Sequence, residues 1–238
     1  MIKRIGKICK DYWHRRNSDA FIDYLRDKGI TIGDRCVFRS PGSTQIDISR
    51  ATLISIGDNV DMNRNFTIMA HDWASLVFRA KYHDFINSSG RVNIGDNVYF
   101  GTNVIVLGGV TIGDNCVIGA GSVVTKSIPS DSVAAGVPCR VICSLEDYYK
   151  KRKARGLNEA AARVKSIQEH YGRDPYPSEM REEFIYFVNK SNADKYEAMG
   201  VPIKYQLAEA YDDWMNEHDQ SLFSDFEHFI EYVKNYTE

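Results

Sequence analysis

The feature that most constrains this chain is a six-residue repeat between Arg91 and Ser127. Aliphatic or aromatic residues recur at every sixth position: Ile94, Phe100, Val106, Ile112, Ile118 and Val124. A second track of smaller residues has the same spacing: Val92, Val98, Val104, Val110, Cys116 and Ser122. Neither the helical period nor strand alternation produces a strict period of six, whereas the stacked hexapeptide units of a parallel β-helix do. The repeat therefore predicts a mainly β fold in which three hexads form one triangular coil.

Three hexads per coil bring residues 18 positions apart into register. The predicted stacks are Ile94 over Ile112, Phe100 over Ile118 and Val106 over Val124. Glycine-aspartate-asparagine triplets begin at Gly95 and Gly113, one coil apart, where glycine permits the tight corner between short strands. This recurrence argues against an ordinary sheet of Val- and Ile-rich strands.

Residues 1–29 are predicted to form an N-terminal helical segment. The first 16 residues are basic and carry apolar residues on one helical face, so this stretch could lie on an anionic membrane. Packing of a terminal helix against a neighbour is the favoured interpretation. Ser18 is predicted to be the N-cap of the following helix, and Gly29 to end it.

Residues 30–143 are predicted to form the β-helix domain. The first coil should be irregular because Thr44 and Arg50 break the phase of the repeat. The pattern stops after Ile68 and restarts at Val92, so residues 71–91 are predicted to be an extruded loop. Long loops that leave a rigid scaffold are usually functional.

Residues 144–238 are predicted to be a helical C-terminal region, because the apolar period becomes helical there. A basic run at residues 150–155 is interpreted as a solvated helix face. Aromatic residues at near-helical spacing are interpreted as packing core: Phe184, Phe187, Tyr211, Trp214, Phe226, Phe229 and Tyr232.

Composition limits the classes of protein to consider. A hydrophobic content of 43% and a charged content of 26% suit a soluble globular protein, and a net charge of −2 predicts no general attraction to nucleic acid. No apolar run reaches the ~18 residues of a membrane-spanning helix. Five cysteines give no disulfide framework, and Cys36 and Cys116 fall on the small inward track. The expected compartment is the cytoplasm.

The segment from Ile30 to Ile142 resembles the hexapeptide-repeat O-acetyltransferases, the group of the galactoside, maltose and nodulation-factor enzymes. The resemblance rests on the glycine-aspartate-asparagine hexads and on the stretches from Ile118 to Lys126 and from Ala134 to Ile142. His71-Asp72-Trp73 and the residues from Cys143 to Tyr149 look like acetyltransferases of surface-polysaccharide pathways. The resemblance implies a left-handed parallel β-helix, a homotrimer, and acetyl-coenzyme A bound between adjacent prisms.

The resemblance also implies which residues contact the coenzyme. The positions that match the family are Tyr99, Thr102, Ala120, Thr125, Lys126 and Arg140. Cys143 stands where the sugar enzymes have a second basic residue, so one charged contact to the coenzyme is missing. The N-terminal acceptor-binding segment of those enzymes has no match here, which leaves the acceptor open.

Acetyl transfer to a hydroxyl needs a base, because an alcohol is a poor nucleophile at neutral pH. His71 suits this role, since imidazole titrates near the working pH and the residue lies where the coils give way to the loop. His71 also matches the family's catalytic position. Asp72, another carboxylate or a backbone carbonyl could orient the ring, and His83 is the competing base. No serine or cysteine is placed as a covalent nucleophile, which favours direct transfer in a ternary complex.

The predicted function is transfer of an acetyl group from acetyl-coenzyme A to a hydroxyl of a sugar or polysaccharide precursor. An acetyltransferase for another acceptor, such as an antibiotic or a sugar-nucleotide amine, is the main alternative. A hexapeptide carbonic anhydrase would need three metal-binding histidines, whereas coil and loop supply only His71 and His83. A non-catalytic scaffold would need neither His71 nor the coenzyme contacts. The expected site holds no metal.

Overall fold

The structure, a computed structural model, describes residues 13–235. The predicted helix over the first 16 residues therefore lies largely outside the described residues. The chain divides into two compact units, residues 1–149 and residues 150–238, which are described separately.

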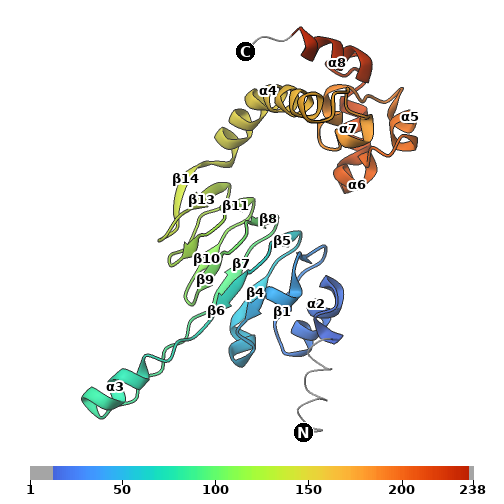
Figure 1. Ribbon diagram of the computed structural model, residues 1–238. Helices are drawn as coiled ribbons and strands as arrows, with labels where there is room; N and C mark the ends of the chain where they lie inside the picture. Colours follow the sequence, from blue (N-terminus) through green and yellow to red (C-terminus); the bar gives the residue numbers. More distant parts are fainter. Residues whose placement is uncertain (1–12, 236–238) are drawn as a thin grey trace. The chain divides into compact units, whose positions relative to one another are not determined.

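The first unit is built from three sheets that the chain visits in turn (Figure 1). The first sheet contains β1 (Thr31–Ile32), β4 (Ile54–Ile56), β7 (Val92–Ile94) and β10 (Thr111–Ile112). The second contains β2 (Val37–Phe38), β5 (Val60–Met62), β8 (Val98–Phe100), β11 (Cys116–Ile118), β13 (Ser132–Ala135) and β14 (Arg140–Ser144). The third contains β3 (Gln45–Ile46), β6 (Thr67–Met69), β9 (Ile105–Leu107) and β12 (Val123–Val124). One passage through all three sheets makes one coil.

The strand register confirms the predicted 18-residue stacking. Ile94 pairs with Ile112, Phe100 with Ile118, and Val106 with Val124, all between parallel strands. Both six-residue tracks are buried in one core, including Cys36 and Cys116. The last strand, β14, departs from the parallel pattern because it pairs antiparallel with β13 at the edge of the second sheet.

Coil lengths vary where the repeat is interrupted. Ile32 pairs with Ile56, so the first coil contains 24 residues and is irregular, as predicted. Its extra residues form two 3₁₀ turns, η1 (Pro41–Ser43) and η2 (Ile48–Leu53). As a result, Ile46 takes the inward position that pairs with Ile68.

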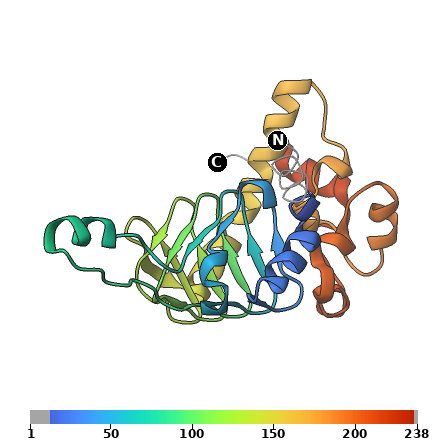
Figure 2. The same ribbon diagram turned by 90° about the horizontal axis from the view of Figure 1, so that it is seen from below.

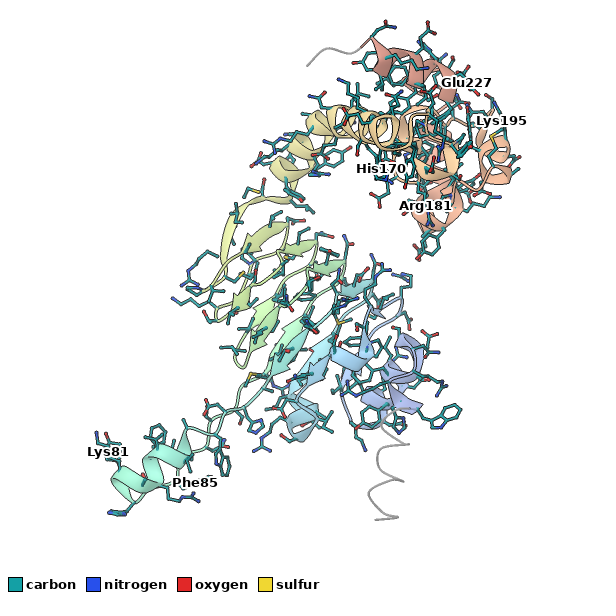
Figure 3. All side chains as sticks on the ribbon, in the orientation of Figure 1. Lys81, Phe85, His170, Arg181, Lys195 and Glu227 are labelled. Atoms are coloured by element: carbon teal, nitrogen blue, oxygen red, sulfur yellow. The ribbon has the colours of Figure 1, made fainter. Side chains whose placement is uncertain are left out.

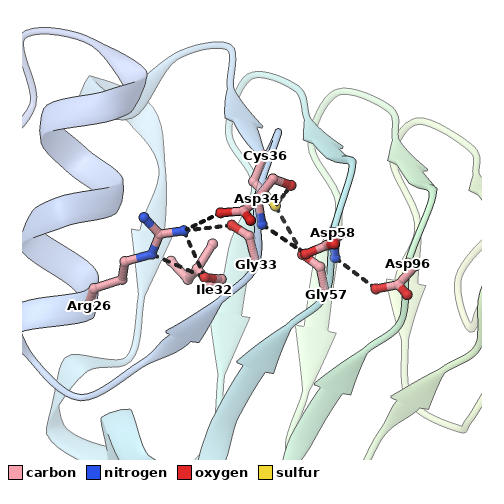
Figure 4. Close-up of polar contacts among 8 residues, drawn as sticks. All are labelled: Arg26, Ile32, Gly33, Asp34, Cys36, Gly57, Asp58 and Asp96. Atoms are coloured by element: carbon pink, nitrogen blue, oxygen red, sulfur yellow. Dashed lines mark hydrogen bonds and ion pairs between the residues drawn. The ribbon is translucent and has the colours of Figure 1, made fainter. Parts of the chain in front are cut away.

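The corners between the first and second sheets are joined by a ladder of aspartates (Figure 4). Asp58 accepts a hydrogen bond from the Asp34 N–H at 2.8 Å, and Asp96 accepts one from the Asp58 N–H at 2.7 Å. A Cβ at Gly57 would lie 2.2 Å from the Asp96 Oδ1 atom, so this corner requires glycine. The repeated glycine-aspartate pairs of the sequence thus tie each coil to the next.

Helix α2 (Ser18–Asp27) covers the start of the coils. Phe21, Ile22 and Leu25 are buried against the core, and Arg26 donates to the Ile32 and Gly33 carbonyls (Figure 4). These contacts satisfy backbone groups that a bare first strand would expose.

The ends of α2 differ in part from the prediction. Asn17 is the N-cap, accepting from the Ala20 N–H at 2.9 Å, whereas the Ser18 hydroxyl accepts from the Phe38 N–H. The prediction of Ser18 as N-cap was therefore wrong: both residue types suit the cap, and contact with β2 recruits Ser18. Gly29 ends the helix with φ +97°, as predicted.

The segment between β6 and β7 projects from the coils as an arm, seen from a second direction in Figure 2. It carries helix α3 (Ser75–Tyr82); Lys81 lies near the outer end of this helix, and Phe85 lies further back towards the coils (Figure 3). Six of its large apolar side chains are more than half exposed: Trp73, Leu76, Val77, Tyr82, Phe85 and Ile86. We refer to residues 71–91 as the arm.

The second unit is helical, and α4 begins at Leu145, shortly before the boundary between the units. Its helices are α4 (Leu145–Tyr171), η3 (Pro177–Glu179), η4 (Glu183–Tyr186), α5 (Ala193–Ala198), α6 (Ile203–Leu207), η5 (Ala208–Ala210), α7 (Tyr211–Glu217) and α8 (Phe226–Lys234). The predicted aromatic residues form its own hydrophobic core or pack against it. Within residues 13–235, no helix combines the length and the apolar character needed to span a membrane.

Candidate active site

His71 lies where the third sheet gives way to the arm. It follows β6 by two residues and pairs with Ser89 in an isolated antiparallel bridge, which closes the base of the arm. This bridge holds the backbone at His71. The side chain is 32% exposed and therefore open to solvent.

The partner of His71 is Asp47, which sequence reasoning did not identify. The Asp47 Oδ2 atom bonds the His71 Nδ1 atom, and the Asp47 Oδ1 atom accepts from the Ser49 hydroxyl at 2.6 Å and the Ser49 N–H at 3.2 Å. The carboxylate thus also caps the 3₁₀ turn η2. Asp47 is only 10% exposed, which protects its bond to the ring from water.

Hydrogen bonding keeps Asp47 ionised. Burial by itself would raise its pKa, but the hydrogen bonds from Ser49 and His71 outweigh burial and hold the pKa of this carboxyl below its usual range. Asp47 therefore stays negatively charged at neutral pH and can stabilise positive charge on the His71 ring.

Asp72, the carboxylate considered first from sequence, serves the arm instead. Its oxygens accept hydrogen bonds from the Ala74 N–H at 2.8 Å and the Ser88 hydroxyl at 2.6 Å. These bonds lower the pKa of Asp72, that from Ser88 being the stronger. In the sequence, Asp47 lies between Phe38 and Ile56, where the six-residue repeat loses its phase. Only the strand register shows that this break brings Asp47 to His71.

Two hollows meet at His71 on the outer face of the third sheet. One, of about 370 Å³, is lined by Arg15, Gln45, Ile46, Asp47, Thr67, Ile68, Met69 and His71. The other, of about 190 Å³, is lined by Met69, His71, Asp72, Ser88, Leu107 and Gly108. Because Met69 and His71 belong to both, we call these the β3 hollow and the β9 hollow. The imidazole lies at their junction.

Four of the predicted coenzyme residues flank the third sheet. Thr125 and Lys126 follow β12 and are exposed at the same corner of the coil as His71, further along the sheet. Thr102 and Ala120 are neighbours at the opposite corner, where the Gly121 N–H donates to the Thr102 carbonyl at 2.8 Å. The structure therefore arranges these four residues around the sheet that carries both hollows.

The other two predicted residues lie elsewhere. Tyr99 points outward from β8 in the second sheet and lines a separate hollow of about 310 Å³. Arg140 begins β14 and donates to the Cys139 carbonyl at 2.7 Å. A single chain thus does not bring Tyr99 into the hollows that contain His71.

The competing base, His83, is placed less favourably. It is the C-cap residue of α3 on the arm, with φ +56°. It is exposed, and no rigid strand holds it. Residues 13–235 contain no cluster of three or more side chains suited to hold a metal ion.

The repeated coils match a bacterial transferase family. A family model for bacterial transferase hexapeptide proteins (six repeats) matches residues 91–126. Protein CapG of Staphylococcus aureus is 35% identical over 174 residues, which cover 73% of this chain and 91% of CapG. The chain belongs to the bacterial hexapeptide-repeat transferase family.

Two further relatives match parts of the chain. Galactoside O-acetyltransferase of Escherichia coli (strain K12) is 45% identical over 106 residues, covering 41% of this chain. That match spans 49%, about half, of the galactoside enzyme's own length. The solved structure of a galactoside acetyltransferase in complex with coenzyme A is 30% identical, covering 62% of this chain and 83% of that one, with a TM-score of 0.42.

Proposed function

We propose that this protein transfers an acetyl group from acetyl-coenzyme A to a hydroxyl group of a sugar or polysaccharide precursor. The observation that carries the proposal is the His71–Asp47 pair at the junction of the β3 and β9 hollows. Such a junction allows two substrates to meet at one imidazole. The named activity of the galactoside O-acetyltransferase relative supports the choice of a sugar hydroxyl.

In this proposal His71 is the general base. Its Nδ1 atom is occupied by the Asp47 carboxylate, which leaves Nε2 as the nitrogen with a free lone pair. Asp47 stabilises the imidazolium that forms when Nε2 takes the hydroxyl proton. The Ser49 hydroxyl donates to the same carboxylate and helps to fix it in place. We propose direct transfer between the two substrates.

The chemical step then balances without a covalent enzyme intermediate. As the acceptor oxygen attacks the thioester carbonyl carbon, its proton passes to His71 Nε2. The carbon–sulfur bond breaks when the tetrahedral intermediate collapses, and the imidazolium returns the proton to the coenzyme thiolate. The products are the acetyl ester and free coenzyme A, and His71 is neutral again.

We place acetyl-coenzyme A along the third sheet, with its acetyl end in the β9 hollow. Lys126 and Arg140 would meet its phosphates by charge-assisted hydrogen bonds, and Thr102, Ala120 and Thr125 would line its path. Tyr99 lies on the second sheet, so a coenzyme that touches both Tyr99 and His71 needs two copies of the chain. The proposal therefore includes a homotrimer with three equivalent sites between copies, and coils of left-handed winding.

The test compares His71→Ala with His83→Ala at saturating acetyl-coenzyme A, using a panel of sugar acceptors. The His71 variant should lose about 10²–10⁴ in turnover, the usual contribution of a positioned proton acceptor. Its coenzyme affinity should stay unchanged, because the side chain is outside the core. The His83 variant is the matched control. An active His71→Ala enzyme beside an inactive His83→Ala enzyme would overturn the assignment.

A further inference from the structure

The β3 hollow contains a cation that the acetyl-transfer mechanism does not use. Arg15 lines this hollow together with Asp47 and His71. The remaining lining includes the polar side chains of Gln45 and Thr67 beside the half-exposed Met69. Hydrogen-bonding side chains around one apolar platform suit a sugar ring, and the volume of about 370 Å³ is enough for one.

The structure holds the Arg15 guanidinium in place. Its Nη1 atom donates to the Pro41 carbonyl at 2.5 Å and to the Thr44 carbonyl at 2.8 Å. The guanidinium also stacks over the Phe21 ring, 4.8 Å from its centroid. Fixing a long side chain in this way removes the entropy cost that a ligand would otherwise meet.

The positive charge of Arg15 is not neutralised within residues 13–235. Both of its anchors are neutral carbonyl oxygens, and no carboxylate there forms an ion pair with it. Its Nε and Nη2 atoms, which are donors, have no hydrogen-bond partner among the same residues.

Asp47 is the nearest candidate for a counter-charge, since it lines the same hollow. Its two oxygens are already engaged by His71 and by Ser49, so the carboxylate is committed to orienting the ring. A held guanidinium with unused donors, beside a committed carboxylate, is a site for an anion.

We propose that the acceptor is an acidic sugar, whose carboxylate or phosphate group binds Arg15 while its hydroxyl faces His71. This inference rests on the proposed function, because it assigns the β3 hollow to the acceptor and the β9 hollow to the coenzyme. A carboxylate and a phosphate have the same recognition chemistry here, since both accept two parallel N–H bonds from guanidinium. Testing one acceptor that carries a carboxylate and one that carries a phosphate distinguishes between the two groups.

The first experiment measures kcat/KM for three acceptors: an oligouronate, its carboxyl-reduced neutral counterpart, and a hexose phosphate. The wild-type protein should prefer one acidic acceptor over the neutral one by roughly 10- to 100-fold, the effect of one charged hydrogen-bond pair. Arg15→Gln should abolish this preference, and Arg15→Lys should retain part of it. The KM for acetyl-coenzyme A should not change in either variant.

Arg16→Gln is the matched control. Arg16 is adjacent in sequence but exposed, stacks over Trp13, and does not line the hollow. It should keep the wild-type preference. Equal rates on acidic and neutral acceptors in the wild type, or a preserved preference in Arg15→Gln, would overturn the inference while leaving acetyl transfer intact.

A binding measurement separates this inference from the proposed function. Calorimetry with the oligouronate and the hexose phosphate, in the absence of acetyl-coenzyme A, should give binding to the wild type that weakens at least 10-fold in Arg15→Gln. That result with no acetyl transfer to any sugar would contradict the proposed function but support the anion site. No difference between wild type and variant for either acid would overturn the site itself.

Discussion

A substitution can isolate one role of Asp47, which is to hold the His71 ring through the ring's Nδ1 atom. Asp47→Asn keeps the shape of the side chain but removes the charge that stabilises the imidazolium. Turnover should fall, by up to the ~10²–10⁴-fold that loss of the base costs, while the KM for acetyl-coenzyme A stays the same. Steady-state kinetics checks this, with Asp34→Asn, an exposed carboxylate of the same coil, as control. An equal fall in both variants would mean that the effect is on folding.

The pH dependence of the rate follows from the same pair. The lowered pKa of Asp47 keeps that carboxylate ionised to a lower pH than an ordinary carboxyl group. We therefore expect no loss of activity at mildly acidic pH that comes from protonation of Asp47. A loss in that pH range that occurs in the wild type but not in Asp47→Asn would contradict this expectation.

Lys126 and Arg140 provide a prediction about the coenzyme alone. Replacing either by Ala should weaken acetyl-coenzyme A binding by roughly 1–3 kcal/mol, the value of a charged hydrogen bond. The acceptor KM should change little. Calorimetry measures the affinity, and Lys28→Ala, at the end of α2, is a control of the same charge. Unchanged affinity in both variants would place the coenzyme elsewhere.

At the scale of elements, η3 in the helical unit depends on one ion pair. Arg173 bonds both oxygens of Glu179, at 2.8 and 2.9 Å, and the Tyr176 N–H donates to the same carboxylate. The Arg173 bonds, followed by that from Tyr176, lower the pKa of Glu179 to about 2. Because the folded pKa is depressed, the stabilisation is complete above the unfolded pKa of about 4.3 and is lost as the pH falls towards 2.

The measurement is urea unfolding of the full chain, followed by circular dichroism at 222 nm, a helix signal. Wild type should be more stable than Glu179→Gln at pH 7, and the two should converge as the pH approaches 2. Exposed Glu169, which lies on α4, gives a control substitution, Glu169→Gln. A difference between wild type and Glu179→Gln that persists unchanged at pH 2 would contradict the assignment of this pKa.

At the scale of the whole molecule, the arm is the strongest argument for assembly. Six of its large apolar side chains are more than half exposed in a single chain, and the Trp73 and Phe85 rings pack edge to face, 5.8 Å apart. A patch of this kind usually marks an interface. Light scattering should give the mass of a trimer, and Val77→Asp should reduce it, because a buried charge opposes packing. A stable wild-type monomer at micromolar concentration would contradict the homotrimer.

The sequence by itself determined the coils, because their information is local and repeated. Each hexad specifies an inward residue and a corner, and the same pattern recurs in each stacked coil. The pairs Ile94–Ile112 and Val106–Val124 could therefore be predicted before any contact was known. The helical character of the second unit was readable for the same reason, since its period is local.

Only the tertiary structure decided which residues meet His71. Asp47 contacts the ring from the irregular first coil, and Arg15 lines the same hollow from the segment before α2; no period operates in either stretch. Their positions depend on the pairing of Ile46 with Ile68 and on two carbonyls that anchor a guanidinium. Such contacts join distant parts of the chain. Their geometry follows from the lengths of insertions and from the packing of the coil, which no local pattern encodes.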